Sequence, residues 1–221
     1  ANNDTGYDGH GIWLFPGSHN NLIVDNVATG HDEGIETDGG MYNVITNNDM
    51  SRNAYGIFLD DGASWNTVVN NTASSNSNVG IASSEGSWNL IRDNTCNDNA
   101  YGVWILQRAH RNVIYGNQLL RNARGLWFYS APSNNTAAAN ETSYSTQYGI
   151  DVEQSTPGTT RGNIIAWNTT VSNGLGGISL EATSSNRLYL NTFSNAAGNV
   201  NSWGTNFWVS PTPLTYAYGA A

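Results

Sequence analysis

Six carboxylates fall within two short stretches of the sequence, at residues 31–38 and 59–62. A pair of carboxyl groups, one protonated and one ionised, can act as acid and base in the hydrolysis of a glycosidic bond. Carboxylate oxygens can instead hold Ca²⁺, which takes several oxygen ligands, and a third interpretation is an acidic edge in contact with water. No other cofactor is expected. The six are Asp32, Glu33, Glu36, Asp38, Asp60 and Asp61, of which Glu36, Asp38, Asp60 and Asp61 are the candidate Ca²⁺ ligands.

Aromatic and arginine residues form a second group of side chains that could bind a ligand. Aromatic rings can stack on the apolar faces of sugar rings, and the planar guanidinium group of arginine pairs bidentately with a carboxylate, such as that of an acidic sugar. Pairing of the arginines with carboxylates of the same chain is the alternative. The residues that we expect to contact a glycan are Trp13, Phe58, Trp104, Trp127, Tyr129, Arg108 and Arg124.

An internal repeat must position both groups. A Gly-apolar-x-apolar unit recurs in steps of 22 to 24 residues, apart from one step of 28, and asparagines recur with it in pairs five residues apart. A period of this length with short β runs is typical of stacked coils. Asparagines at one coil position would form a ladder of side-chain amides, and asparagine also tolerates the left-handed backbone of tight corners. The glycines are Gly11, Gly34, Gly56, Gly80, Gly102, Gly125, Gly149 and Gly177, and the first asparagines are Asn21, Asn43, Asn66, Asn89, Asn112, Asn135, Asn163 and Asn186.

Three columns of mostly apolar residues accompany the repeat. They lie one position after each glycine and two positions after each asparagine of a pair, and Cys96 belongs to the last column, so we interpret it as a small core residue. The sequence therefore predicts an all-β fold, a right-handed single-stranded parallel β-helix of about eight coils. We expect the β-helix to occupy residues 1–195 and a C-terminal capping segment to occupy residues 196–221.

Strand alternation predicts a face that combines aromatic and acidic residues. Residues two and four positions after each glycine should point away from the core. These positions carry Trp13, Glu36, Phe58, Trp104 and Trp127, followed two residues later by Phe15, Asp38, Asp60, Leu106 and Tyr129.

Composition excludes several classes of partner. The net charge is −9 and all eight basic residues are arginines, so no large basic surface for nucleic acid can form. No apolar run is long enough to span a membrane, and one cysteine allows no intramolecular disulfide. The first residues contain no signal peptide, so we expect a mature or excised chain.

The repeats GIFLDDGASWNTVVNNTASSN, residues 56–76, and GVWILQRAHRNVIYGNQLLRN, residues 102–122, resemble a known family. They are similar to the parallel β-helix repeat of carbohydrate-binding and sugar-hydrolysing proteins. That repeat also occurs in archaeal surface proteins and in the accessory protein of nitrous-oxide reductase maturation. The resemblance implies a β-helix over residues 9–195. By resemblance to C5-epimerases on this fold, His31 beside Asp32, with His10 one coil earlier, is a candidate catalytic group, although the Asp-Pro-His element of those enzymes is absent. Glu36, Asp38 and Asp60 of the carboxylate cluster are further catalytic candidates.

Three functions remain open. The first hypothesis is a secreted or cell-surface module that binds polysaccharide through the aromatic and acidic face. The second is an enzyme, namely a polysaccharide lyase, a uronate C5-epimerase or a glycoside hydrolase. The third is a structural rod that self-associates end to end or side by side.

Overall fold

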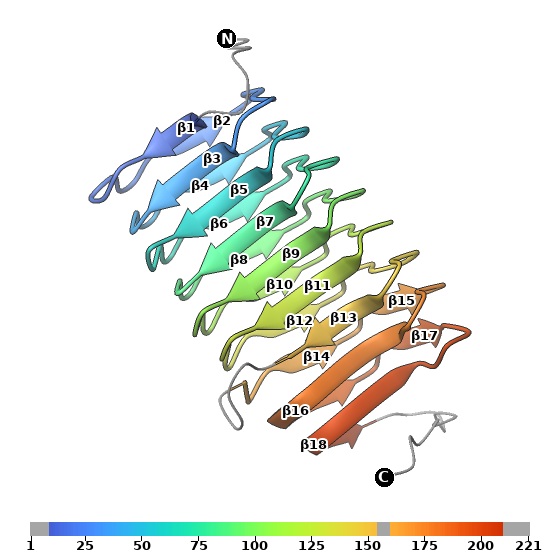
Figure 1. Cartoon of the computed structure of the whole chain (residues 1–221). Coiled ribbons are helices and arrows are strands. Elements are labelled where there is room, and N and C mark those ends of the chain that lie inside the picture. The colour runs from blue at the N-terminus through green and yellow to red at the C-terminus, as the bar shows by residue number, and fades with distance from the viewer. Residues whose placement is uncertain (1–8, 154–159, 210–221) are drawn as a thin grey trace.

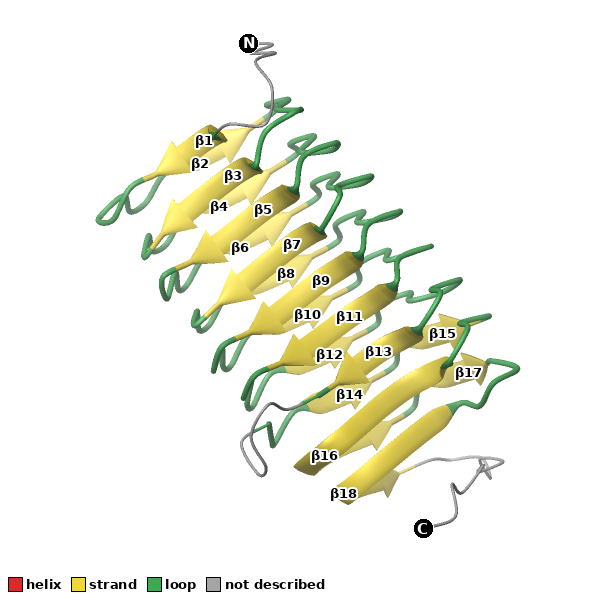
Figure 2. Cartoon of the chain, viewed as in Figure 1, coloured by secondary structure: helices red, strands yellow, loops and turns green. Residues whose placement is uncertain are grey.

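The computed structural model describes residues 9–153 and 160–209 and shows a parallel β-helix in which each coil contributes one long strand and one short strand. Equivalent strands of successive coils pair in parallel, and Figure 1 shows them stacked along the rod. All regular elements of the described residues are strands (Figure 2). The predicted all-β right-handed solenoid of about eight coils is therefore confirmed.

The long strands form one sheet, in the order β1-β3-β5-β7-β9-β11-β13-β16. Their bounds are β1 His10–Leu14, β3 Glu33–Asp38, β5 Tyr55–Asp60, β7 Val79–Ser84, β9 Tyr101–Leu106, β11 Arg124–Tyr129, β13 Tyr148–Val152 and β16 Gly176–Tyr189.

The short strands form the second wall. Their bounds are β2 Leu22–Val24, β4 Val44–Thr46, β6 Thr67–Val69, β8 Leu90–Arg92, β10 Val113–Tyr115, β12 Thr136–Ala138 and β14 Ile164–Ala166. Strand β16 pairs with both β13 and β14, so it joins the two walls at the C-terminal end. A third wall consists of isolated bridges and of β15 Thr169–Val171 paired with β17 Thr192–Ser194.

The sheet continues beyond residue 195. Strand β18, Val200–Val209, pairs in parallel with β16 and adds a further rung, and Asn206 accepts hydrogen bonds from Asn186 in the next place of the asparagine ladder. The expected cap at residues 196–221 thus begins as a continuation of the helix, and its part from residue 210 lies outside the described residues.

The three predicted apolar columns form one continuous core. Its members include Ile57, Val68, Ala73 and Cys96, all without exposed surface. Burial raises the pKa of the Cys96 thiol, which is therefore an uncharged core side chain.

The asparagines form ladders inside the corners, as predicted. The backbone N–H and side-chain amide of Asn94 both donate to Oδ1 of Asn117 at 3.0 Å, and Oδ1 of Asn94 accepts from the backbone N–H of Asn71 at 2.9 Å. The side chain of Asn94 also donates to the carbonyl of Val68 in the preceding coil at 3.0 Å. Each ladder member thus satisfies backbone groups of both neighbouring coils, which is why asparagine recurs.

The left-handed backbone conformation lies one residue earlier than expected. The ladder asparagines themselves are not left-handed, whereas the residues that precede them are, as at Trp65 (φ 59°), Asn70 (φ 56°) and Trp88 (φ 59°). The role of the ladder asparagines in the corners is therefore hydrogen bonding, and the expectation that they supply the left-handed turn is wrong.

The repeated glycine is required by the close approach of consecutive coils. A Cβ atom on Gly102 would lie 2.5 Å from the carbonyl oxygen of Gly125, and one on Gly34 would meet the side chains of Asn53 and Met50. The glycine therefore faces the interior, as does the residue after it, and the residue before it faces outward. This irregularity places an additional column of side chains on the outside of the long-strand sheet.

Candidate functional site

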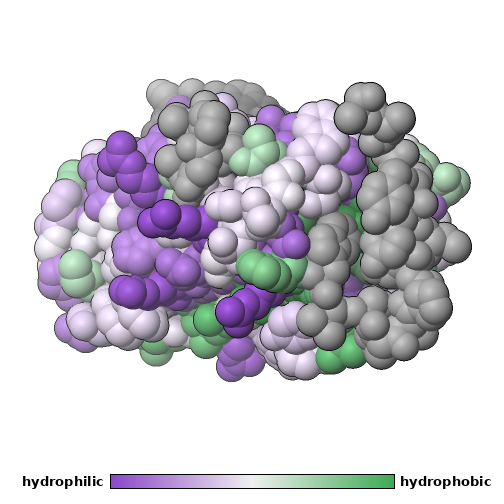
Figure 3. All heavy atoms as spheres, turned by 90° about the horizontal axis from the view of Figure 1, so that it is seen from below, coloured by the Kyte–Doolittle hydropathy of each residue, from purple (hydrophilic) through white to green (hydrophobic). Residues whose placement is uncertain are grey.

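We call the outside of the long-strand sheet the outer face. It carries three columns of side chains, which come one residue before each repeated glycine and two and four residues after it. Because equivalent residues of adjacent coils lie side by side, these side chains cover one another, and Glu36, Ala82 and Asp151 are buried although they point away from the core. Figure 3 views the molecule from below the orientation of Figure 1, and on that side hydrophilic and hydrophobic residues are intermixed.

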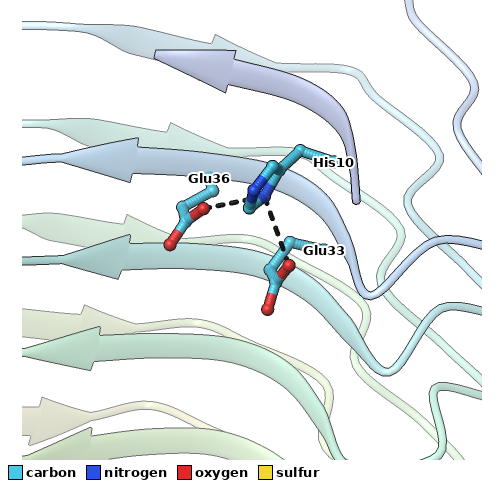
Figure 4. A group of neighbouring side chains, drawn as sticks. All are labelled: His10, Glu33 and Glu36. Atoms are coloured by element: carbon cyan, nitrogen blue, oxygen red, sulfur yellow. Dashed lines mark ion pairs between the residues drawn. The ribbon is translucent and has the colours of Figure 1, made fainter. Parts of the chain in front are cut away.

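A cluster of one imidazole and two carboxyl groups lies at the N-terminal end of the outer face (Figure 4). His10 is on β1, and Glu33 and Glu36 are on the adjacent strand β3. Nδ1 of His10 lies 2.7 Å from Oε2 of Glu36 and 3.2 Å from Oε2 of Glu33. The geometry at Nδ1 is not that of a hydrogen bond, so both contacts are ion pairs when the imidazole is protonated. We call these three residues the His10 cluster.

The environment of Glu36 favours its protonated form. Burial, followed by the negative charges of Asp38 and Glu33, raises the pKa of Glu36 from 4.5 to about 7. Burial also raises the pKa of Glu33, although His10 opposes the shift. A carboxyl group that exchanges its proton near neutral pH can serve as a general acid or a general base.

The acidic residues predicted as Ca²⁺ ligands are brought together in part. Carboxylate oxygens of Glu36, Asp38 and Asp60 lie within 4.8 Å of one another, on β3 and β5. Asp61 is exposed and does not belong to that group. Asp38 also accepts a hydrogen bond from Nε1 of Trp13 at 3.1 Å, which ties the carboxylates to the aromatic column.

The other predicted catalytic pair lies apart from this cluster. His31 is buried, and its backbone N–H donates to Oδ1 of Asn53, at the end of an asparagine ladder. Asp32 is exposed, and neither residue belongs to a group of three close metal-binding side chains in the described parts of the chain. The geometry favours His10 over His31 as the imidazole of the site.

Aromatic rings dominate the middle of the outer face. The rings of Trp104 and Trp127 are stacked, with centroids 4.9 Å apart and planes 10° apart, and the ring of Tyr129 lies 4.8 Å beyond Trp127. Trp127 is only 8% exposed. The two indoles therefore turn their faces toward each other along the rod, which leaves little of Trp127 for a ligand to contact. Phe58 likewise stacks on Tyr55 at 5.2 Å.

The arginines predicted to bind an acidic sugar differ in their surroundings. Nε of Arg124 donates to Oδ2 of Asp151 at 2.7 Å, and its guanidinium group lies 4.6 Å from the centroid of Trp127, so its charge is already compensated. Asp151 is 2% exposed, and burial raises its pKa to about 6 against the opposing effect of Arg124. Arg108 is exposed at a left-handed corner and has no ion-pair partner within residues 9–153 and 160–209.

A comparison of the sequence with protein families identifies its family. The family model described as "Periplasmic copper-binding protein (NosD)" matches residues 1–146 and 128–220. The chain belongs to this family. No curated protein sequence matches the chain.

Solved structures similar to this NosD-family chain share its fold. The periplasmic alginate epimerase AlgG is similar with a TM-score of 0.72 and 18% identity, over 83% of this chain and 47% of the epimerase chain. An alginate lyase from Paenibacillus sp. str. FPU-7 is similar with a TM-score of 0.57 and 14% identity, over 93% of this chain and 92% of the lyase. The NosD-family chain spans about half the length of the epimerase. At such identities the similarity concerns the architecture alone.

Sequence reasoning missed one column of the NosD-family site. Strict alternation assigned the residue before each repeated glycine to the interior, whereas the structure places His10, Glu33, Tyr55 and Tyr101 on the outer face. Arg124 occupies the same column and is the one member that was predicted to contact a glycan. A signal was present in the sequence, since this position is mostly polar or aromatic while the position after the glycine is always apolar.

Proposed function

We propose that this chain binds polysaccharide along its outer face. The observation that carries the proposal is the arrangement of rings and hydrogen-bonding carboxyl groups in parallel columns on one sheet of a long rod, with Trp13 joined to Asp38 beside the His10 cluster. A sugar chain offers hydroxyl groups to the carboxyl groups and apolar C–H surfaces to the rings. The similarity in fold to an alginate epimerase and an alginate lyase supports a carbohydrate ligand.

The charge of the outer face should determine which class of polysaccharide binds. Carboxyl groups of Glu33, Asp38 and Asp60 surround Glu36, and Arg124 of the outer face is paired with Asp151. A polyuronate would meet like charges at close range. We therefore expect a neutral polysaccharide to bind more tightly than a polyuronate, unless a cation such as Ca²⁺ bridges the two sets of carboxylates.

Binding to a panel of neutral and acidic polysaccharides, with and without Ca²⁺, tests this proposal. Trp13→Ala should weaken the binding of the neutral chain at least tenfold, because Trp13 is 41% exposed beside the His10 cluster. Trp65→Ala is the matched control, since Trp65 is 46% exposed but lies at a corner away from the outer face. Equal loss from both variants would show that the glycan does not select the outer face. No binding by the wild type would favour the structural-rod hypothesis, which sedimentation velocity would then test through self-association.

A second candidate function is catalysis at the His10 cluster. The specific observation is the pKa of Glu36, raised to about 7, together with the His10 imidazole at 2.7 Å, because a carboxyl group that gains and loses a proton near neutral pH can act as an acid or a base. Glycoside hydrolysis would use Glu36 as the acid with Asp38 or Asp60 as the second carboxylate. A lyase or C5-epimerase would instead withdraw a proton from a uronate and needs its carboxylate neutralised.

Product analysis separates these reactions. Hydrolysis releases reducing ends, a lyase forms an unsaturated sugar, and an epimerase changes the sugar without cleaving the chain. Glu36→Gln should abolish whichever activity exists while Trp65→Ala leaves it unchanged. Binding without any product would leave the chain a binding module.

We further propose a location outside the cytoplasm. The names of the family and of the similar epimerase both specify the periplasm. In the described residues there is no helix that could cross a membrane. An extracellular or cell-surface location would be the finer alternative, and fractionation with a periplasmic marker distinguishes the two.

A further inference from the structure

The family name refers to copper. The side chains of this chain that could bind copper are its soft and borderline donors, namely the histidines, the cysteine and the methionines. The sequence contains four histidines, one cysteine and two methionines, and all of them lie in described parts of the structure. Soft thiolate and thioether sulfur atoms are the ligands that favour cuprous copper. We infer that the folded chain does not form a site for cuprous copper.

The sulfur atoms of two donors are enclosed in the core. Cys96 and Met50 have no exposed surface, and both belong to the apolar column that lines the β-helix. The thiolate is the form that binds metal, and burial raises the pKa of the Cys96 thiol, so the folded chain disfavours that form. Neither residue can act as a ligand without opening the coil.

Three histidines are isolated from other donors. His31 is buried at the N-terminal end of an asparagine ladder, and Nδ1 of His110 lies 3.3 Å from the carbonyl oxygen of Arg108. Nδ1 of His19 accepts a hydrogen bond from the backbone N–H of Met41 at 3.0 Å. None of the three belongs to a close group of three His, Cys, Asp or Glu side chains in the described residues.

The remaining histidine lies among hard ligands. His10 is grouped with Glu33 and Glu36, so the cluster offers one imidazole nitrogen and two carboxylate oxygens. Such a set suits hard divalent ions or cupric copper better than cuprous copper. A cupric ion, if it binds at all, would therefore bind at His10.

The strongest opposing candidate is the pair His19 and Met41. The two residues come from adjacent coils, and Met41 is an exposed methionine. They supply at most one imidazole nitrogen and one thioether sulfur, with no third donor from a close His, Cys, Asp or Glu among the residues that the structure describes. Substitution of this pair is therefore part of the test.

The unfolded chain should bind cuprous copper more tightly than the folded chain does. The unfolded chain releases Cys96 and Met50 from the core, so it offers sulfur donors that the folded chain withholds. A ligand that binds the unfolded state preferentially destabilises the folded state. Cuprous copper should thus lower the melting temperature of this protein, or leave it unchanged, and should not raise it.

The test combines thermal melting with competition against a chromophoric cuprous chelator, both under anaerobic reducing conditions with the whole 221-residue chain. We expect the folded wild type to leave all cuprous copper with the chelator. Any fall in melting temperature should disappear in Cys96→Ser, whose fold is checked by circular dichroism. A rise in melting temperature would overturn the inference. So would one equivalent of copper retained by the folded wild type, and its loss in the double variant His19→Gln with Met41→Leu would assign the site to that pair.

The test is independent of the proposed polysaccharide binding. A chain that retains cuprous copper could still bind a glycan on the outer face, and a chain that binds neither would refute only the proposed function. The wild-type competition needs no variant, so it decides the inference even where a substitution prevents folding.

Discussion

Glu36 is the single residue whose surroundings change its chemistry most. In the unfolded chain its carboxyl group loses the proton near its ordinary pKa of 4.5, whereas in the folded chain burial and neighbouring carboxylates raise the pKa to about 7. The folded state therefore binds the proton more tightly. The contribution of Glu36 to stability is fully present below about pH 4.5 and is lost as the pH rises through about 7.

Melting temperatures measured over a range of pH test whether stability falls as the pH rises. The melting temperature of the wild type should fall as the pH rises from about 4.5 to about 7. In Glu36→Gln the fall should be smaller, because only Glu33 and Asp151, whose pKa values are also raised, still contribute to it. Asp98→Asn is the control, because a hydrogen bond from Arg121 lowers the pKa of Asp98 and its contribution is lost only at lower pH. A wild-type melting temperature that rises over this interval would contradict the environment assigned to Glu36.

Trp127 combines a position on the outer face with the burial of a core residue. It is stacked between Trp104 and Tyr129, lies against the guanidinium group of Arg124, and donates from Nε1 to Glu153 at 3.1 Å. Truncation of a buried aromatic side chain typically costs about 3 to 5 kcal/mol of folding free energy.

We expect Trp127→Ala to reduce the free energy of unfolding by about 3 kcal/mol, measured by denaturant titration. The exposed control, Trp65→Ala, should change it much less. The sequence alone suggests that Trp104 and Trp127 form an exposed platform whose removal leaves the melting temperature unchanged. The stacked geometry gives Trp127 a structural role, so its loss of binding must be separated from a loss of stability.

At the scale of the element, each corner depends on its asparagine ladder. Asn94→Ala removes the acceptor of the Asn71 backbone N–H and of the Asn71 side chain, and the donor to the carbonyl of Val68. A buried group without its partner costs about 1 to 3 kcal/mol. Denaturant titration should show a loss in this range, whereas the exposed Thr72→Ala should stay within about 0.5 kcal/mol. Equal values for the two variants would mean that the ladder is dispensable.

The long strands depend in turn on the repeated glycine at the second position of each strand. In Gly102→Ala the new Cβ atom would meet the carbonyl oxygen of Gly125 at 2.5 Å, and a backbone atom cannot rotate away. We expect a loss of about 3 kcal/mol or more, the upper end of the cost of overpacking. Gly62→Ala is the matched control, since its Cβ atom meets nothing within 4 Å and only the left-handed φ of 75° costs about 1 kcal/mol. The reverse order of the two losses would show that consecutive coils are not held this closely.

At the scale of the whole molecule, one core runs through every coil. Ile91 has no exposed surface in the middle of that core, and its neighbour Leu90 points outward on the same strand, β8. A charge buried without a partner is among the most costly changes in a protein. Ile91→Asp should therefore abolish the cooperative melting transition followed by circular dichroism, and Leu90→Asp should retain it. A cooperative melt of Ile91→Asp at the wild-type temperature would mean that the assignment of inward columns is wrong.

The architecture could be predicted from the sequence alone, because the same packing rule recurs in all eight repeats. Glycines, paired asparagines and three apolar columns recur at fixed positions within each repeat. Each of these positions meets one packing requirement of a stacked coil. The close glycines at Gly34 and Gly102, the ladder at Asn94 and the buried thiol of Cys96 all follow from that rule.

The set of side chains that share the outer face could not be predicted without the folded structure. The inward turn of each repeated glycine breaks strict alternation, and so His10 and Glu33 join Glu36 while His31 enters the corner. Adjacent coils are close enough for the rings of Trp104 and Trp127 to stack face to face. Arg124 is likewise close enough to Asp151 to form a hydrogen bond. A repeat fixes the position of a residue along the coil, but neighbouring coils carry different side chains. Their mutual burial and charge therefore depend on contacts between residues that lie more than 20 positions apart in the sequence.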